Sequence, residues 1–254
     1  MLPLLMERVI NEESYIIKTS RESSTKGFNS KQLIASLTKP MISYYFNEFL
    51  AEEYKISLDD KVGKYFGTTH LITLRDLIEH RSGVFDYLEL EESFINESRL
   101  EDISKIILTK SQYDPPNKVA YSNSGYVLLS RVIEIITGAE YEKAIENFYK
   151  TKDIEVSFSK DYSNYIKGWG DGEFIMSPND YLRFIKLPNI KTYFPKLKNG
   201  ISYFSGFCPG FETLCCFNEN EYFVLFRKGV EDSLFTDELL DLIEGISDGG
   251  PGET

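Results

Sequence analysis

A serine and a lysine three positions apart are the first residues of this chain that could do chemistry. Ser36 and Lys39 would lie on one face of a helix, about one turn apart. A serine hydroxyl becomes a strong nucleophile when a nearby base takes its proton. A lysine amine can be that base where burial or a neighbouring cation lowers its pKa from about 10.4. The spacing therefore predicts acyl transfer by a serine that a lysine activates.

The same spacing occurs three times, so its context has to decide. The run around Ser23 and Lys26 is polar and predicts a loop, and no clear helix follows Ser157. Ser36, in contrast, opens an apolar segment with helical periodicity. Its apolar members are Leu37, Met41, Ile42, Tyr45, Phe46, Phe49 and Leu50. Because Pro40 is tolerated only in or near a first turn, we expect this helix to begin close to Ser36, where free N–H groups favour negative charge.

Tyr121-Ser122-Asn123 is a second segment with chemical potential. It follows the pair Pro115-Pro116, which predicts an extended or turn conformation, and it precedes an apolar helical run. Tyr121 and Asn123 could therefore face one cleft. A tyrosine can relay a proton, and an asparagine can orient a lysine or bind an amide oxygen. The alternative is that Tyr121, one of 17 tyrosines, only packs in the core.

Taken in order along the chain, these segments resemble the serine β-lactamase-like and penicillin-binding-protein-like hydrolases. The resemblance is greatest to the branch of class C β-lactamases, D-alanyl-D-alanine peptidases and esterases. It runs from about Gly27 to Arg227 and includes residues 33–40, 56–62, 72–83 and 174–182 as well as the Tyr-x-Asn motif. Several ordered matches are more specific than any one motif.

The resemblance implies a role for each candidate residue. It makes Ser36 the nucleophile, Lys39 the base or its partner, and Tyr121 the proton relay to the leaving group. Asn123 would hold the lysine or the substrate amide. The backbone N–H groups of Ser36 and Phe207 would form an oxyanion hole, whose donors typically contribute about 3 kcal/mol each to the transition state.

The third motif of the family departs from its usual pattern here. Family members usually carry Lys or His, then a small residue and Gly, where this chain has Phe204-Ser205-Gly206-Phe207. We expect these four residues to contact the substrate. A cation at the first position would help to bind a substrate carboxylate, which Phe204 cannot do by charge. We therefore expect a substrate without a free carboxylate, an ester or an amide.

The surrounding pattern predicts the elements that position these residues. Ser14–Lys18, Phe211–Phe217 and Tyr222–Arg227 are predicted strands, and residues from about 31 to 150 are predicted to be mainly helical, with a loop near residues 63–67. Thr73 with Asp76, and Ser177 with Asp180, are predicted helix caps. We expect an α+β fold, in which an antiparallel sheet of N- and C-terminal strands is flanked by helices and a helical lobe is inserted at about residues 50–170. Residues 1–246 would form one domain, ending in an amphipathic helix at residues 234–246, and residues 247–254 a disordered tail.

Composition excludes several classes of function. The net charge of −12 over 254 residues argues against binding to nucleic acid or an anionic membrane surface. No apolar run approaches the ~20 residues that cross a bilayer, and the N-terminus shows no signal-peptide pattern, so we expect a cytoplasmic protein. The three cysteines are expected to be buried free thiols. No cluster of metal ligands is visible, and neither a metal nor a cofactor is expected.

Other catalytic chemistries fit less well. The chain has two histidines and no Gly-x-Ser-x-Gly motif, which disfavours a Ser-His-Asp hydrolase. No histidine is evident near Cys208. Gly168-Trp169-Gly170-Asp171-Gly172 lacks the spacing of a phosphate loop and is predicted to be a flexible turn.

Two functional hypotheses follow. The first is an active serine hydrolase that cleaves an amide or ester of a small-molecule or peptide-like substrate through an acyl-enzyme at Ser36. The second is a catalytically silent relative that binds a peptide-like or acyl ligand in the same cleft. The sequence leaves open the oligomeric state and the choice between β-lactamase, peptidase and esterase activity.

Overall fold

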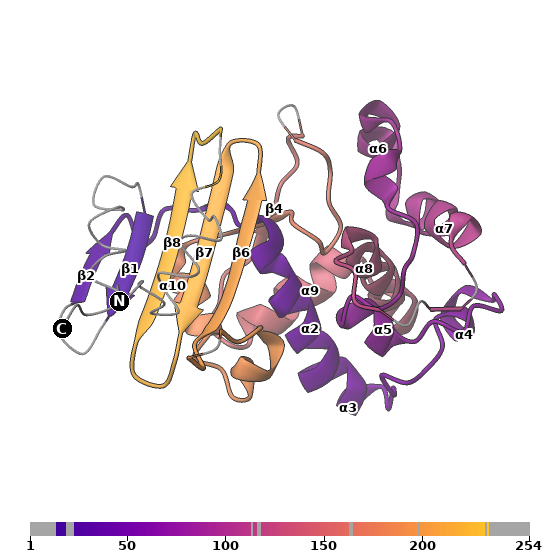
Figure 1. The fold of residues 1–254 in the computed structure, drawn as a ribbon, viewed down its shortest axis with the longest axis horizontal. Helices are drawn as coiled ribbons and strands as arrows, with labels where there is room; N and C mark the ends of the chain where they lie inside the picture. Colours follow the sequence, from indigo (N-terminus) through magenta and orange to yellow (C-terminus); the bar gives the residue numbers. More distant parts are fainter. Residues whose placement is uncertain are drawn as a thin grey trace, which may run out of the picture. The chain divides into compact units, whose positions relative to one another are not determined.

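The computed structural model describes residues 14–18, 23–112, 114–115, 118–162, 165–197, 199–231 and 233 (Figure 1). These described residues form an α+β fold and divide into two compact units. Residues 14–37 and 176–233 form the first, here called the sheet unit, and residues 38–175 form the second, the helical unit. The predicted helix at residues 234–246 and the predicted tail lie outside the described residues.

The sheet unit is built on a five-stranded antiparallel sheet in the order β2-β1-β8-β7-β6 (Figure 1). Strand β1 pairs with β8, with Ile16 opposite Val224, so an N-terminal strand joins the C-terminal ones as predicted. Its strands are β1 (Ser14–Lys18), β2 (Ser23–Lys26), β6 (Ser202–Cys208), β7 (Phe211–Phe217) and β8 (Tyr222–Lys228). The remaining elements of this unit are β3 (Gln32–Leu33), η1 (Ala35–Leu37), α10 (Pro178–Phe184) and η4 (Ile190–Tyr193).

Both faces of the central strands are buried. One face carries a cluster that includes Ile17, Leu214, Phe223 and Leu225. Helix α10 packs against β1 and β8, and the rings of Tyr181 and Phe226 lie 6.2 Å apart. The Ser177 hydroxyl accepts a hydrogen bond from the Asp180 N–H at 3.1 Å, so the predicted cap of α10 is confirmed. The aromatic and aliphatic runs that predicted these strands therefore supply the core of the unit.

Strand β2 corrects one expectation. The residues around Ser23 and Lys26 were predicted to be a loop, but they pair with β1. Residues three apart on a strand point to opposite faces, so this Ser-Lys pair lacks the geometry that a helix provides. Ser157 also lies in a strand, β4 (Ser157–Phe158). Of the three Ser-Lys spacings, the one at Ser36 lies on helical backbone.

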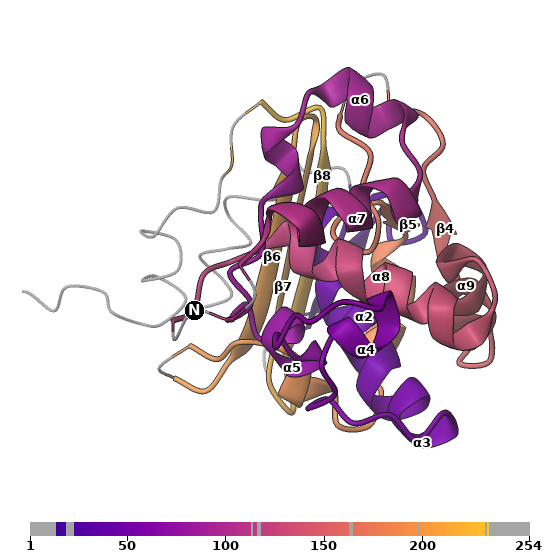
Figure 2. The same cartoon turned by 90° about the vertical axis from the view of Figure 1, so that its right-hand side faces the viewer.

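The helical unit is organised around α8, which packs against α2, α5, α7 and α9 (Figure 2). Helix α8 begins after Ser122, whose hydroxyl accepts the Gly125 N–H, and it ends at Gly138 in the left-handed conformation. The helices of this unit are α2 (Thr38–Tyr45), η2 (Phe46–Leu50), α3 (Ala51–Glu53), α4 (Gly63–Phe66), α5 (Leu74–Ile78), η3 (Tyr87–Glu89), α6 (Glu92–Glu97), α7 (Leu100–Lys110), α8 (Asn123–Thr137) and α9 (Tyr141–Lys150). Two short strands, β4 (Ser157–Phe158) and β5 (Phe174–Met176), pair with each other.

Local signals explain the ends of the short helices. Thr73 and Asp76 form the predicted capping box of α5, with the Asp76 N–H donating to Thr73 Oγ1 at 3.1 Å and the Thr73 N–H to Asp76 Oδ2 at 2.8 Å. The loop predicted near residues 63–67 is wrong, because Gly63–Phe66 form α4. Gly67 ends this helix with a φ of +66°, and a Cβ at Gly63 would collide with the Thr68 backbone. These glycines permit a helical turn here rather than break one.

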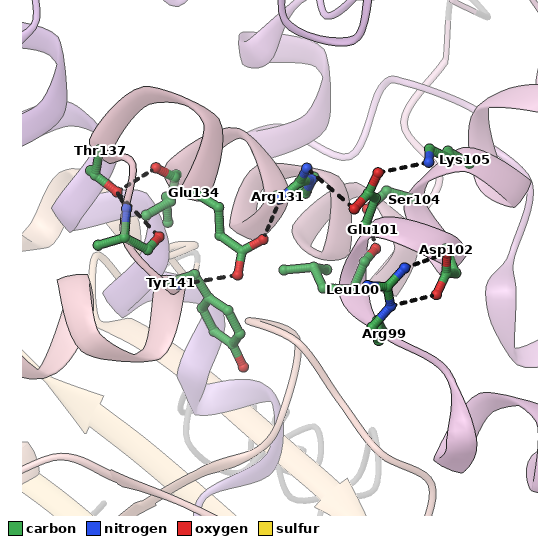
Figure 3. Close-up of polar contacts among 12 residues, drawn as sticks. Arg99, Leu100, Glu101, Asp102, Ser104, Lys105, Arg131, Glu134, Thr137 and Tyr141 are labelled. Carbon is green, nitrogen blue, oxygen red and sulfur yellow. Dashed lines mark hydrogen bonds and ion pairs between the residues drawn. The ribbon is translucent and has the colours of Figure 1, made fainter.

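Polar contacts link α7, α8 and α9 on the surface of the helical unit (Figure 3). Arg131 of α8 pairs with Glu134 at 2.7 Å and with Glu101 of α7 at 3.8 Å. The Tyr141 N–H, at the start of α9, donates to Glu134 at 3.4 Å. Ion pairs near the surface contribute little stability each, but this series places Tyr141 relative to α8. None of the helices in the described ranges is long and apolar enough to cross a membrane.

Candidate active site

Ser36 lies in η1, a turn of 3-10 helix directly before α2, so the predicted helix start is confirmed. The residue before it, Ala35, has a φ of +47°. This left-handed conformation costs a residue with a Cβ about 1–2 kcal/mol and occurs often at functional sites. The backbone is therefore strained immediately before the candidate nucleophile.

Strands β6 and β7 hold this strained turn in place. A Cβ at Gly206 would lie 2.6 Å from the Ser36 nitrogen and 2.9 Å from the Ile34 oxygen, so the Ser36 backbone passes directly over this glycine. Thr213, opposite Gly206 in β7, donates its hydroxyl to the Ile34 carbonyl at 2.7 Å. Gly206 is thus required by a close backbone approach, and Thr213 anchors the residues before Ser36.

The backbone of β6 indicates where its N–H groups point. This strand lies at the end of the five-stranded sheet, and the Tyr203 N–H donates to the Pro195 oxygen outside the sheet. Because strand geometry repeats every two residues, the N–H groups of Ser205 and Phe207 point to the same side, away from β7. The Phe207 side chain is 42% exposed. Its N–H group thus has the direction that an oxyanion donor needs.

Phe204 gives the third motif an apolar environment. It is half-buried in β6, and its ring meets the Phe194 ring edge-on, with centroids 6.3 Å apart. Cys208 is half-buried, and burial raises the pKa of its thiol to about 12. All three cysteines are free, and Cys208 has no thiolate character that would make it a nucleophile.

Lys39 belongs to α2 of the helical unit and has no exposed surface. Its Nζ donates to the backbone oxygen of Asp171 at 2.5 Å. The same nitrogen lies 5.0 Å from the ring centroid of Tyr121 and 5.7 Å from that of Tyr126. The structure therefore brings together two of the predicted residues, Lys39 and Tyr121, with the tyrosine ring facing the amine.

Tyr121 is held by His80, which lies in residues 72–83, one of the segments that carry the resemblance. The rings of His80 and Tyr121 stack with centroids 4.5 Å apart and an angle of 27°. His80 Nδ1 accepts the Ser122 N–H at 3.0 Å, and the His80 oxygen accepts the Ala120 N–H at 2.7 Å. Tyr121 itself is 57% exposed. His80 thus fixes the backbone on both sides of Tyr121 while the tyrosine stays accessible.

His80 is neutral near pH 7. Burial, reinforced by the positive charge of Lys39, lowers its pKa to about 4. Because Nδ1 accepts a backbone N–H, the proton of the neutral ring is on Nε2. His80 also has a φ of +57°, which is uncommon for a residue with a Cβ. These features make His80 a support for Tyr121, since the nitrogen that could act as a base is already used.

Asn123 is the first residue of α8 and is half-buried. Its expected role, to hold the lysine or the substrate amide, stays a prediction. One hydrogen bond of the lysine goes to the loop at residues 168–173, through the Asp171 oxygen. The sequence predicted a flexible turn there, yet Trp169, Gly170 and Asp171 are buried.

Two acidic residues of that loop were missed from the sequence. Asp171 lies against Lys39, and Glu173 accepts the Tyr141 hydroxyl at 2.6 Å. The alternation of glycines with acidic residues marks a turn, but nothing in it shows that the turn is buried. Among the described residues, no group of three or more His, Cys, Asp or Glu side chains could hold a metal ion.

The sequence matches a family model and a group of curated proteins. The family model described as Beta-lactamase matches residues 21–200. Teichoic acid D-alanine hydrolase of Staphylococcus aureus (strain MRSA252) is 28% identical over 178 residues, which cover 59% of this chain and 44% of that protein. The chain thus spans less than half the length of the curated relatives it matches.

Two solved structures illustrate the likeness in fold. FmtA from Staphylococcus aureus matches with a TM-score of 0.73 at 18% identity, over 96% of this chain and 85% of that one. The D-amino acid amidase from Ochrobactrum anthropi SV3, complexed with D-phenylalanine, matches with a TM-score of 0.71 at 16% identity, over 95% of each chain. At these identities the structural matches establish the shared fold.

Proposed function

Because the chain belongs to the Beta-lactamase family, we propose that it hydrolyses an ester or amide through an acyl-enzyme on Ser36. The observation that carries the proposal is the buried Lys39 beside the accessible Tyr121. Burying an ammonium costs several kcal/mol, and a structural role alone would be served as well by an apolar side chain. A role as the base for a serine nucleophile would explain why a buried lysine is present despite this cost.

Acylation would use the residues in the following roles. Ser36 Oγ attacks the substrate carbonyl carbon while its proton passes to Lys39 in the amine form. The N–H groups of Ser36 and Phe207 would stabilise the negative charge on the carbonyl oxygen by about 3 kcal/mol each. The bond to the leaving oxygen or nitrogen then breaks, and Tyr121 relays the proton to the leaving group. The product of this half-reaction is an ester on Ser36.

Deacylation would reverse the proton transfers with water in place of the leaving group. Water attacks the acyl carbon, its proton passes to the amine of Lys39, and the bond to Ser36 Oγ breaks as the oxygen regains a proton. His80 would take no part in these transfers, because its Nδ1 already accepts a hydrogen bond and its pKa, lowered by burial to about 4, makes the ring a weak base. Its contribution would be to keep Tyr121 in position.

The proposed substrate is a D-aminoacyl ester or amide without a free carboxylate. Phe204 and Phe194 form an apolar contact at the position where many family members carry a cation for that carboxylate. The names of two relatives, a teichoic acid D-alanine hydrolase and a D-amino acid amidase, support D-aminoacyl compounds as the class to test. An apolar site leaves a carboxylate unpaired and disfavours its binding.

The first test is the intact mass of the protein after exposure to a fluorophosphonate and, separately, to a penicillin. We expect one fluorophosphonate adduct that is absent in Ser36→Ala, and little or no adduct from the carboxylate-bearing penicillin. Hydrolysis of D-alaninamide and of D-alanine methyl ester should then exceed that of D-alanyl-D-alanine. Absence of any adduct on the native chain would contradict catalysis and support the ligand-binding alternative.

A further inference from the structure

Residues 168–173 place two carboxyl groups in the interior of the helical unit. Asp171 is 7% exposed and Glu173 is 1% exposed. Aspartate and glutamate are almost never fully buried unless they are paired, because the loss of hydration costs several kcal/mol per charge. The partners of these two groups therefore indicate the purpose of the loop.

Asp171 is held on both its side chain and its backbone. Its Oδ1 accepts the Trp169 N–H at 2.8 Å, and its Oδ2 accepts the Tyr87 hydroxyl at 2.8 Å. Its backbone oxygen is the acceptor for Lys39 Nζ. One residue thus connects the lysine of α2 to η3, and the position of the amine depends on the position of this loop.

Glu173 is held by three hydrogen bonds to its carboxyl oxygens. Its Oε1 accepts the Gly170 N–H at 2.7 Å and the Tyr141 hydroxyl at 2.6 Å, and its Oε2 accepts the Gly172 N–H at 3.2 Å. Tyr141 is the first residue of α9, and contacts with α8 place it there (Figure 3). The glutamate therefore ties the loop to a second part of the helical unit.

The two carboxyl groups converge on Gly168. A Cβ on this residue would lie 2.8 Å from Asp171 Oδ1 and 3.1 Å from Glu173 Oε2. Like charges this close oppose each other's ionisation. Burial and the negative charge of Asp171 raise the pKa of Glu173 to about 7. Burial also raises the pKa of Asp171, and the positive charge of Lys39 opposes that rise.

Several titratable groups face this acidic pair. They are Lys39 of α2, Tyr87 of η3, Tyr141 of α9 and Tyr162, and Glu142 acts on the last two. Burial raises the pKa of each of the three tyrosines, so they stay neutral, and Glu142 is paired with Lys160 at 2.6 Å. Among these groups, Lys39 carries the positive charge that acts on Asp171.

We propose that Asp171 and Glu173 are positioning residues that hold Lys39 in place and determine when it releases its proton. The inference rests on the proposed function in that Lys39 is the base for Ser36. When both carboxyl groups are ionised, they favour the ammonium. When Glu173 carries a proton, one negative charge is gone and Lys39 gives its proton to solvent more readily. The acidic pair thus makes the amount of active base depend on the protonation of a group that does not touch the substrate.

The test follows the protonation of Lys39 directly, by the ¹³Cε chemical shift in protein labelled with ¹³C-lysine. The Lys39 signal is assigned by its absence in Lys39→Met. In Glu173→Gln we expect Lys39 to lose its proton at a pH about one unit lower than in the native chain. The matched control is Glu146→Gln, which removes an exposed carboxylate of α9 that pairs with Lys143 and should leave the Lys39 signal unchanged.

The rate of fluorophosphonate labelling at Ser36 across the same pH range separates this inference from the proposed function. Labelling of the native chain, with the same Lys39 titration in Glu173→Gln, would overturn the inference and leave the function standing. A shifted Lys39 titration without any labelling would support control of the lysine and refute the hydrolase. In an active enzyme, the pH at which the labelling rate rises should shift together with the pH at which Lys39 loses its proton.

A second variant keeps the test decisive if Glu173→Gln does not fold. Tyr141→Phe keeps both carboxyl groups and removes one hydrogen bond to the ionised form of Glu173. It should shift the Lys39 titration in the same direction by a smaller amount. A folded Tyr141→Phe protein with the native Lys39 titration would overturn the inference.

Discussion

Gly206→Ala tests how the sheet unit positions Ser36. The added Cβ would lie 2.6 Å from the Ser36 nitrogen, 2.9 Å from the Ile34 oxygen and 3.0 Å from the Ala35 Cβ. Ordinary contacts of a Cβ begin at 3.4 Å, so the nearest atom is about 0.8 Å too close. The three contacts are with the backbone and Cβ of the η1 segment, which cannot rotate away as a flexible side chain would. The turn that carries Ser36 has to move off β6.

The expected magnitude follows from this displacement. Overpacking of a buried site costs about 1–3 kcal/mol. In a protein of this size each kcal/mol lowers the melting temperature by about 2–4 °C. A displacement near 1 Å of a reacting group can lower its rate on the order of 100-fold. We therefore expect a modest loss of stability and a much larger loss in the rate of Ser36 labelling.

The assay compares two alanine variants in the same hairpin. Labelling by a fluorophosphonate is followed by intact mass over time, and thermal unfolding is measured in parallel. Gly210→Ala is the matched control, because its φ of +85° makes alanine cost about 1–3 kcal/mol while no atom lies within 4 Å of the added Cβ. This control should lose stability to a similar degree and keep its labelling rate.

Two results would refute this reasoning. A native labelling rate in Gly206→Ala would show that the position of the turn over β6 does not matter for reactivity. An equal loss of rate in Gly210→Ala would show that reactivity follows global stability rather than the local contact.

Three further predictions concern the two units separately. Thr213→Val should lower the free energy of unfolding by about 1–3 kcal/mol in urea titrations, because the buried carbonyl that its hydroxyl binds loses a partner, and Thr213→Ser should restore most of it. Phe204→Lys should raise kcat/KM for D-alanyl-D-alanine relative to D-alaninamide about tenfold or more; an unchanged ratio would remove the reason for a carboxylate-free substrate. His80, with a pKa of about 4, binds fewer protons in the folded chain than its usual value near 6.5 allows, so it adds stability as pH rises from 4 to 6.5. Glu173, with a pKa of about 7 against its usual 4.5, acts oppositely and removes stability as pH rises from 4.5 to 7. Urea unfolding of His80→Asn should therefore show stability falling across pH 4.5–7, and a profile equal to the native one would contradict the assignment.

Strands β7 and β8 were predictable because their signals are local. Phe211–Phe217 and Tyr222–Lys228 are runs of aromatic, aliphatic and cysteine side chains separated by a turn of asparagines, and both faces of such strands are buried in the structure. The short helix α4 was missed for the opposite reason. Its glycines look like loop residues, whereas Gly63 is required by the nearby Thr68 backbone and Gly67 by a left-handed helix end.

In the candidate site, too, the residues with a local sequence signal were predicted and those without one were missed. Ser36 and Lys39 stand out because both residues of the motif lie within one turn of helix. His80 and the acidic loop do not, because their roles depend on partners distant in sequence. Asp171 bonds to Tyr87, and this contact joins residues 84 positions apart. A turn rich in glycine and acidic residues is predicted to be solvent-exposed, because the sequence does not show which distant residues cover it in the fold.

The left-handed backbone at Ala35 has a consequence for laboratory evolution. A φ of +47° suits glycine better than alanine, and Ala35 is buried, so a larger residue would not fit there. Libraries selected for survival of heating alone should accumulate glycine at position 35. Libraries selected for turnover should keep alanine if the strain holds Ser36 in its reactive geometry. The residue found at this position after parallel selections would show which of the two demands has shaped the turn.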